Sequence, residues 1–280
     1  MRQILTLLVV TIMGLLPFSL HGAAKDKVVD FNYPQDVSKN ALADLENALK
    51  SGDGRLVVDA IVRYSIAQSG ISEENMGDIV SRIESTLQQE KRPEYRALLN
   101  YFEACVFREY HLRYGVWDRE NPDEDVEADD ISTWDDASFG KKINELQCAA
   151  LSQPEELKRH PITEFEGIIR YDEQGALLVP TLYQFLCLQC GNDSVVGNLW
   201  RQSVVDNIPA YIYACLRTGG NAEKLYKQFK DNEHCGLALR ETYVDEDLYA
   251  AYKDYVARFP ESIYTRSIEN KIAELDPERC

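Results

Sequence analysis

The spacing of apolar side chains constrains the fold of this chain more than any other feature. Along most of the sequence they recur every three to four residues, as in the stretch from Met76 through Ile79, Val80 and Ile83 to Leu87. A period of 3.6 fits a helix with one buried face, whereas a strand would leave half of these side chains in water. Glycine and proline are scarce, with 15 and 10 of 280 residues. The sequence therefore predicts an all-α fold.

Short breaks separate the predicted helices. Ser51–Gly54 divides a helix expected over 37–50 from one over 55–68, and Pro93 suits the first turn of another helix. Breaks of this length make neighbouring helices antiparallel. The chain shows no strict 34-residue period, so we expect an antiparallel helical array or an irregular solenoid. Further helices are expected at 137–150, 180–190, 195–216 (kinked or divided at Pro209) and 221–230.

The segment 245–275 predicts a helix pair around the turn Pro260–Ser262. An aromatic residue and a proline close the first helix, which is similar to the hinge of a tetratricopeptide-type repeat. Such a pair cannot bury its apolar face alone and needs stacked neighbours. Its tyrosines have two interpretations, helix–helix packing with the hydroxyls at the surface or a tyrosine-lined groove for a peptide. These tyrosines are Tyr249, Tyr252, Tyr255 and Tyr264.

Residues 1–24 have the features of a secretory signal. Arg2 precedes an apolar run from Ile4 to Leu16, and small residues follow at 22–24. The run is shorter than the roughly 20 residues that a spanning helix needs. We therefore expect an exported protein without a transmembrane segment in the mature chain. Its remaining parts would be a polar lead-in at 25–36 and a helical domain at 37–280.

The formal net charge of -17 disfavours nucleic acid and anionic lipid as partners, because both carry negative charge. Ten acidic residues gather in 118–136, where the apolar period is lost and a loop is expected. Asp123, Asp125, Glu127 and Asp129 alternate as in a calcium loop. However, Ala128 and Trp134 replace the glycine and glutamate that an EF-hand requires, so a solvated loop is the simpler interpretation. Ser132 and Asp135 resemble a cap for the next helix.

Seven cysteines are present, an odd number, and most lie in apolar helical patterns. Buried free thiols are the simplest interpretation, although export makes disulfides possible. Cys187 and Cys190 form a Cys-x-x-Cys pair without a preceding strand or a second pair, which gives little support for a redox or metal site.

Sequence motifs of common enzymes are missing. The chain contains no GxGxxG, GxxxxGK[ST], GxSxG or HExxH pattern. Three histidines follow the signal segment, His111, His160 and His234, and they are widely separated in the sequence. We therefore predict a protein that is not an enzyme. No catalytic, cofactor-binding or metal-binding residue is assigned, and no cofactor is expected.

Three ordered strings carry a family resemblance. YPQDVSKNALADLENALKSGDGRLVVDAIVRYSIAQSGIS, ADDISTWDDASFGKKINELQCAAL and YDEQGALLVPTLYQFL resemble the amino-terminal region of very large bacterial alpha-2-macroglobulin-like proteins. The resemblance runs from about Tyr33 to Leu275. It implies a tetratricopeptide-like helical region that precedes a row of macroglobulin β-sandwich domains in a protease-inhibitor family of the Gram-negative cell envelope.

The working parts of that family, a bait segment and in many members a Cys-x-Glu-Gln thioester, have no counterpart in this chain. The resemblance therefore implies a non-catalytic scaffold or interaction region in the periplasm or at the outer membrane. Its partners would be downstream macroglobulin domains of the same or a longer chain, with envelope proteins also possible. The alternative is a free-standing secreted helical module that binds a peptide or a glycan.

Overall fold

The computed structural model describes residues 34–69, 75–114, 131–169, 173–190 and 194–276. Within these ranges the fold is all-α. The strand-like pairing in them is limited to two isolated β-bridges. The chain divides into two compact units. Unit 1 comprises 1–172 and 181–186, and unit 2 comprises 173–180 and 187–280.

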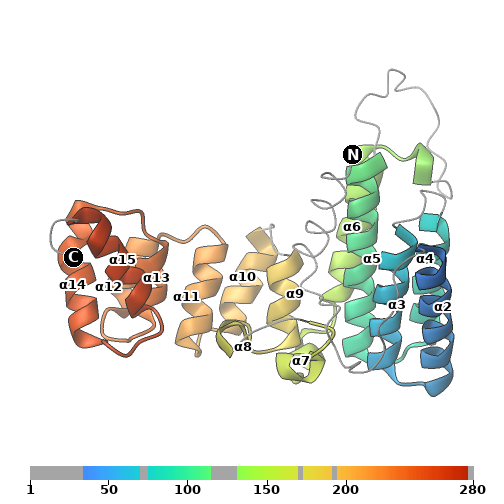
Figure 1. The fold of residues 1–280 in the computed structure, drawn as a ribbon, viewed down its shortest axis with the longest axis horizontal. Coiled ribbons are helices and arrows are strands. Elements are labelled where there is room, and N and C mark those ends of the chain that lie inside the picture. Colours follow the sequence, from blue (N-terminus) through green and yellow to red (C-terminus); the bar gives the residue numbers. More distant parts are fainter. Residues whose placement is uncertain (1–33, 70–74, 115–130, 170–172, 191–193, 277–280) are drawn as a thin grey trace. The chain divides into compact units, whose positions relative to one another are not determined.

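Unit 1 is a row of helices in which each packs against the next along the chain, from α2 to α6 (Figure 1). A further short helix, α7, packs against α5, and the first residues of α9 complete the unit. The elements are α2 (Pro34–Ser51), α3 (Gly54–Ser69), α4 (Asn75–Gln89), α5 (Pro93–Tyr114), η1 (Ile131–Thr133), α6 (Asp136–Ala150), α7 (Pro154–Leu157), η2 (Ile162–Phe165) and the start of α9 (Leu182–Cys190).

The turn between α2 and α3 follows from its residue types. Gly52 has a φ of 68°, which a residue without a Cβ adopts easily. The Asp53 side chain accepts a hydrogen bond from the Arg55 backbone N–H and so supports the first turn of α3. A Cβ on Gly54 would lie 2.4 Å from Cδ2 of Tyr95. Glycine at this position therefore lets α3 approach the start of α5.

Helix α5 is the centre of unit 1. Pro93 is its first residue, as predicted, and α3, α4, α6 and α7 pack around it. The apolar residues that recur every three to four positions along α5 are all buried. These residues are Leu98, Leu99, Phe102, Val106 and Tyr110.

Unit 2 consists of successive helix pairs. Within the pairs, α10 packs on α11, α12 on α13 and α14 on α15; between them, α13 contacts both α11 and α15. Residues 235–239 of α13 are buried without exception. The elements are α8 (Glu173–Leu178), the end of α9, α10 (Ser194–Ser203), α11 (Ile208–Arg217), α12 (Ala222–Phe229), α13 (Cys235–Glu241), η3 (Glu246–Leu248), α14 (Tyr249–Arg258) and α15 (Thr265–Leu275).

Helix α15 has two unlike faces. Ile268 is fully buried on the side that packs in unit 2, whereas Arg266, Glu269, Asn270 and Glu274 are exposed. The exposed residues lie three and four positions apart, so they form one polar stripe along the helix.

Several predicted boundaries are wrong by a few residues. The lead-in expected at 25–36 overlaps α2, which begins at Pro34. The loop expected at 118–136 overlaps η1 and the first residue of α6, and the cap of α6 is Asp135 rather than Ser132. Pro209 does not kink a helix, because the break lies at 204–207 and Pro209 sits in the first turn of α11. Residues 1–33 and 115–130 lie outside the described residues.

Three residues that the apolar spacing places on a buried face are exposed. They are Leu49 at 40%, Leu56 at 49% and Ile263 at 63%. Leu49 and Leu56 lie within three residues of the turn between α2 and α3, and Ile263 lies in the turn between α14 and α15. Within the described ranges, no helix is long and apolar enough to cross a membrane.

Candidate functional site

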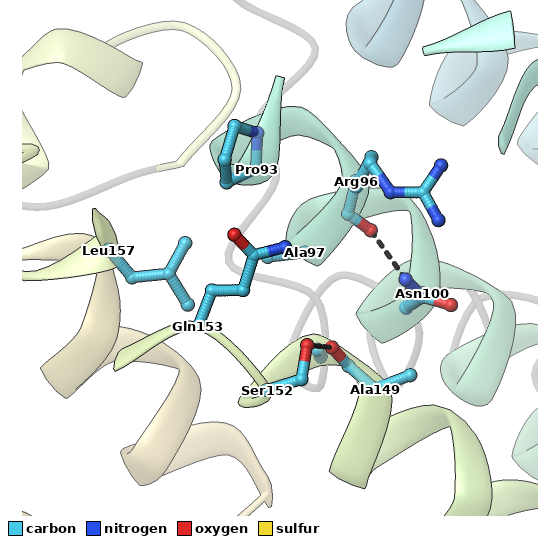
Figure 2. A pocket seen from close by; sticks show the side chains of 9 residues that line it. Pro93, Arg96, Ala97, Asn100, Ala149, Ser152, Gln153 and Leu157 are labelled. Atoms are coloured by element: carbon cyan, nitrogen blue, oxygen red, sulfur yellow. Dashed lines mark hydrogen bonds between the residues drawn. The ribbon is translucent and has the colours of Figure 1, made fainter. Parts of the chain in front are cut away.

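A cavity of about 140 Å³ lies in unit 1 between the start of α5 and the segment that joins α6 to α7. Figure 2 shows Gln153 and Leu157 facing Pro93 and Ala97 across it, with Ser152 and Ala149 at its edge. Pockets for small-molecule ligands usually measure about 300–1,000 Å³. This cavity has room for about four water molecules at roughly 30 Å³ each.

Three polar side chains around this cavity donate hydrogen bonds to backbone carbonyls. The Arg96 guanidinium donates to the carbonyls of Leu87 and Glu90, and it points away from Gln153 in Figure 2. Asn100 donates to the Arg96 carbonyl, and the Ser152 hydroxyl donates to the Ala149 carbonyl. The lining includes no histidine, cysteine or carboxylate, so the Ser152 hydroxyl has no base in the lining to activate it. Its geometry suits a hydrated packing defect better than an active site.

The most unusual ionisable group is Glu103 on α5, whose side chain is 1% exposed. Its Oε1 has no hydrogen bond of good geometry, and Nζ of Lys142 on α6 lies 3.4 Å away. Burial raises the pKa of Glu103 above its ordinary 4.5, Lys142 opposes that shift, and Glu84 adds to it. A buried carboxylate with one incompletely paired oxygen is costly, and groups of this kind are enriched at functional sites.

Lys142 joins Glu103 to two other features of unit 1. Its Nζ lies 3.5 Å from Oε1 of Glu84 on α4 and 5.3 Å from the centre of the Phe107 ring. Trp134 also stacks on Phe107, with ring centres 5.5 Å apart and planes 5° from parallel. One ammonium group therefore connects α4, α5 and α6 beside an aromatic stack.

Sequence reasoning missed Glu103, although a signal for it exists. Glu103 follows Leu99 by four residues and precedes Val106 by three, so it lies on the apolar stripe of α5. A carboxylate at such a position marks a buried ionisable group. Its partner Lys142 lies 39 positions further along the chain, and no local pattern joins the two.

The described cysteines form no disulfide bonds. Cys187, Cys190, Cys215 and Cys235 are buried, as the sequence suggested, but Cys148 is exposed and corrects that expectation. Burial raises the pKa of the Cys235 thiol to about 11, which makes it a poor nucleophile at neutral pH. The Cys187–Cys190 pair occupies the last turn of α9 and forms no disulfide.

The three histidines stand in separate surroundings. His111 stacks on Phe139 and its Nε2 lies 2.7 Å from Oδ1 of Asp136. His160 has Oε2 of Glu164 at 2.9 Å from Nδ1 and Oε2 of Glu94 at 3.8 Å from Nε2.

His234 precedes α13 and packs edge-on against Tyr264, with its Nδ1 buried. His111 and His160 belong to unit 1 and His234 to unit 2. No serine, threonine or cysteine side chain bonds to any of the three rings among the interactions that the structure describes.

The tyrosines of the C-terminal pair pack inside unit 2. Tyr252 and Tyr255 are fully buried and Tyr264 is 1% exposed, which contradicts a groove lined by these three residues. Their hydroxyls were expected at the surface, but Tyr255 Oη donates to the Glu233 carbonyl at 2.7 Å. Tyr252 Oη likewise donates to the Tyr243 carbonyl at 2.9 Å. Helix packing is confirmed, with hydroxyls that bind the backbone of neighbouring turns.

The acidic residues singled out as a calcium-like pattern, Asp123, Asp125, Glu127 and Asp129, lie outside the described residues. Within the described ranges, no three His, Cys, Asp or Glu side chains are grouped so that they could hold a metal ion.

Comparisons with known proteins identified no relative of this chain. No family model matches the chain, and neither a curated protein nor a solved structure matches it significantly.

Proposed function

We propose that this chain is a non-catalytic helical scaffold or interaction region of an alpha-2-macroglobulin-like protein in the bacterial cell envelope. The observation that carries the proposal is the stacking in unit 2, where the second helices of successive pairs pack in the order α11, α13 and α15. Stacked helix pairs form extended surfaces that hold partners or neighbouring domains rather than substrates. On this proposal unit 2 is a short irregular solenoid, and α14–α15 is its tetratricopeptide-like pair.

Contacts between the two C-terminal pairs support this assignment. Tyr255 on α14 donates to the Glu233 carbonyl, and Arg258 donates to the Lys230 carbonyl at 2.8 Å. Both acceptors lie at the turn between α12 and α13, so side chains of one pair hold the turn of the pair before it. Contacts between neighbouring pairs are what a stacked repeat requires, because an isolated pair cannot bury its own apolar face.

The family and the envelope location rest on the resemblance of the three sequence strings and on the signal-like residues 1–24. The partners proposed from that resemblance are downstream macroglobulin domains of the same or a longer chain, and envelope proteins. The role of this region would be to position those domains or to contact an envelope partner.

The mass of the native protein tests the proposal. An antibody raised against residues 25–280 would be used on fractionated source cells. We expect a band several-fold heavier than 32.0 kDa in the envelope fraction. A band slightly below that mass would instead support the free-standing secreted module, and a cytoplasmic band would contradict export.

A further inference from the structure

The cavity between α5 and the segment that joins α6 to α7 carries polar atoms that the fold does not use. We propose that it is a binding site for one primary carboxamide group. This group is either the side chain of an asparagine or glutamine on a partner protein or a free small amide. The proposal concerns recognition and not catalysis, and it does not depend on the function proposed above.

The volume of the cavity limits the size of its ligand. It measures about 140 Å³, close to the roughly 150 Å³ of a cavity that accommodates benzene. The end group of one side chain therefore fits, whereas a drug-sized molecule does not. Anchor side chains at protein interfaces occupy pockets of the partner surface in this way.

Gln153 contributes an amide that the local structure leaves available. It occupies the N-cap position of α7, where a side chain often accepts a hydrogen bond from the first turn of the helix. The Gln153 side chain makes no such bond, and its amide takes part in none of the hydrogen bonds that the structure describes. Figure 2 shows that it extends across the cavity toward Ala97 instead. The carbonyl oxygen and both N–H groups of this amide are therefore available to a ligand.

Two further side chains in the lining present acceptors. The Ser152 hydroxyl donates to the Ala149 carbonyl at 2.8 Å and keeps the lone pairs of its oxygen. The Asn100 amide donates to the Arg96 carbonyl at 2.8 Å and keeps its own carbonyl oxygen. A ligand that satisfies this lining must therefore donate N–H hydrogen bonds as well as accept one.

The charges around the cavity favour a neutral ligand. Arg96 is the only ionisable residue in the described lining, and its guanidinium donates to two backbone carbonyls and points away from Gln153. A carboxylate would find no free cation here, and an ammonium would find no carboxylate, so either ion would be buried without a partner. A primary carboxamide offers two N–H donors and one acceptor without a charge, and it therefore matches the lining.

NMR titration of the full chain with three compounds of equal size and similar shape tests the proposal. They are isobutyramide, isobutyrate and 3-methyl-2-butanone, of which only the first has N–H donors. We expect saturable shifts of the backbone amide signals around Ala97 and Gln153 with isobutyramide, and much weaker responses to the other two. Equal responses to all three, or none to isobutyramide, would overturn the proposal and leave a hydrated packing defect only.

Two variants assign the binding to this cavity, with circular dichroism as the check on folding. Gln153→Met keeps the length of the side chain and removes its amide, so isobutyramide should bind about three- to tenfold more weakly. Ala149→Leu enlarges a lining side chain from an exposed position on α6 and should abolish binding. Lys141→Leu is the matched control, because Lys141 is also exposed on α6 but does not line the cavity. Binding of equal strength in the wild type, Gln153→Met and Ala149→Leu would overturn the proposal.

The tripeptide Gly-Gln-Gly, with Gly-Glu-Gly as its control, distinguishes the two sources of the amide. Binding of Gly-Gln-Gly at least as tight as that of isobutyramide would identify a protein side chain as the ligand, because the flanking backbone then fits over the cavity. Weaker binding of Gly-Gln-Gly would identify a free small amide. Binding of Gly-Glu-Gly as tight as that of Gly-Gln-Gly would overturn the proposal, since the site would then not prefer a neutral amide.

Discussion

At the residue scale, Gly236 fixes how closely α13 and α14 approach. A Cβ at this position would lie 2.2 Å from Oη and 2.4 Å from Cζ of Tyr255. We expect Gly236→Ala to lower the free energy of unfolding by about 1–3 kcal/mol through overpacking, measured by urea denaturation. Gly140→Ala is the control, because its Cβ would meet nothing within 4 Å. That variant should be neutral or more stable by up to about 1 kcal/mol, and equal losses in both would contradict this account.

Glu103 also makes stability depend on pH. Its folded pKa is raised, so its contribution is fully present below the unfolded pKa and is lost as pH rises through the folded pKa. We expect wild type and Glu103→Gln to have similar unfolding free energies at about pH 4, with the variant more stable at about pH 7. Urea denaturation at both pH values measures the difference. A variant that is less stable at neutral pH would show that the ion pair with Lys142 outweighs the burial of charge.

The thiols should differ sharply in reactivity. Cys148 is exposed, whereas Cys235 is buried with a pKa raised to about 11. With Cys280→Ser, iodoacetamide at about pH 8 should label Cys148 first and leave Cys235 unlabelled until urea is added. Mass spectrometry of the peptides measures the order. Rapid native labelling of Cys235 would mean that α13 opens easily.

At the element scale, Tyr255 on α14 contacts two turns, the one between α12 and α13 and the one between α14 and α15. Its hydroxyl donates to the Glu233 carbonyl at 2.7 Å and lies 2.8 Å from Oγ of Ser262. We expect Tyr255→Phe to lower the unfolding free energy by about 1–2 kcal/mol. Tyr243→Phe is a matched control, since that side chain is 93% exposed and its change should stay within about 0.5 kcal/mol. Equal losses of stability for the two variants in thermal melts would contradict a stabilising role for the Tyr255 hydroxyl.

Sequence periodicity predicted most of the elements that bury one stripe and missed the short helices α7, α8 and α13. Helix α5 has both a stripe and a proline start, so its position was predictable. Helix α13 is short and buried along five successive residues, so it has no polar face to mark a period. Ile263 fits the apolar period and is nevertheless exposed, and it lies in the turn before α15, outside either helix of the pair.

The candidate site was less predictable than the fold. Glu103 could be noticed as a carboxylate on an apolar stripe, but its pairing with Lys142 depends on how α5 and α6 dock. The tyrosines of α14 were predictable as packing residues. Their hydroxyl partners were not, because these are carbonyls such as that of Glu233, which any residue can supply.

At the scale of the whole molecule, residues 181–186 belong to unit 1 although the residues on either side belong to unit 2. They bring four buried apolar side chains to unit 1, one of which, Phe185, packs edge-on against Tyr101. Full burial of each is worth about 1.5–3 kcal/mol at most. The four are Leu182, Tyr183, Phe185 and Leu186.

A fragment of residues 25–172 should therefore be markedly less stable than a fragment of residues 25–190. The shorter fragment lacks these side chains, and typical domains have only about 5–15 kcal/mol of stability. Thermal melts followed by circular dichroism would compare the two. Phe185→Ala in the longer fragment is an intermediate control, and its melting temperature should lie between those of the two fragments. Identical melting of all three would mean that residues 181–186 contribute little to unit 1.

The polar stripe on α15 has a consequence for growth of the helical stack. A further helix pair could bury this face only by stripping water from Arg266, Glu269 and Glu274 without giving them partners. This face of α15 therefore disfavours the docking of a further apolar helix pair, and the solenoid proposed for unit 2 would not extend from it.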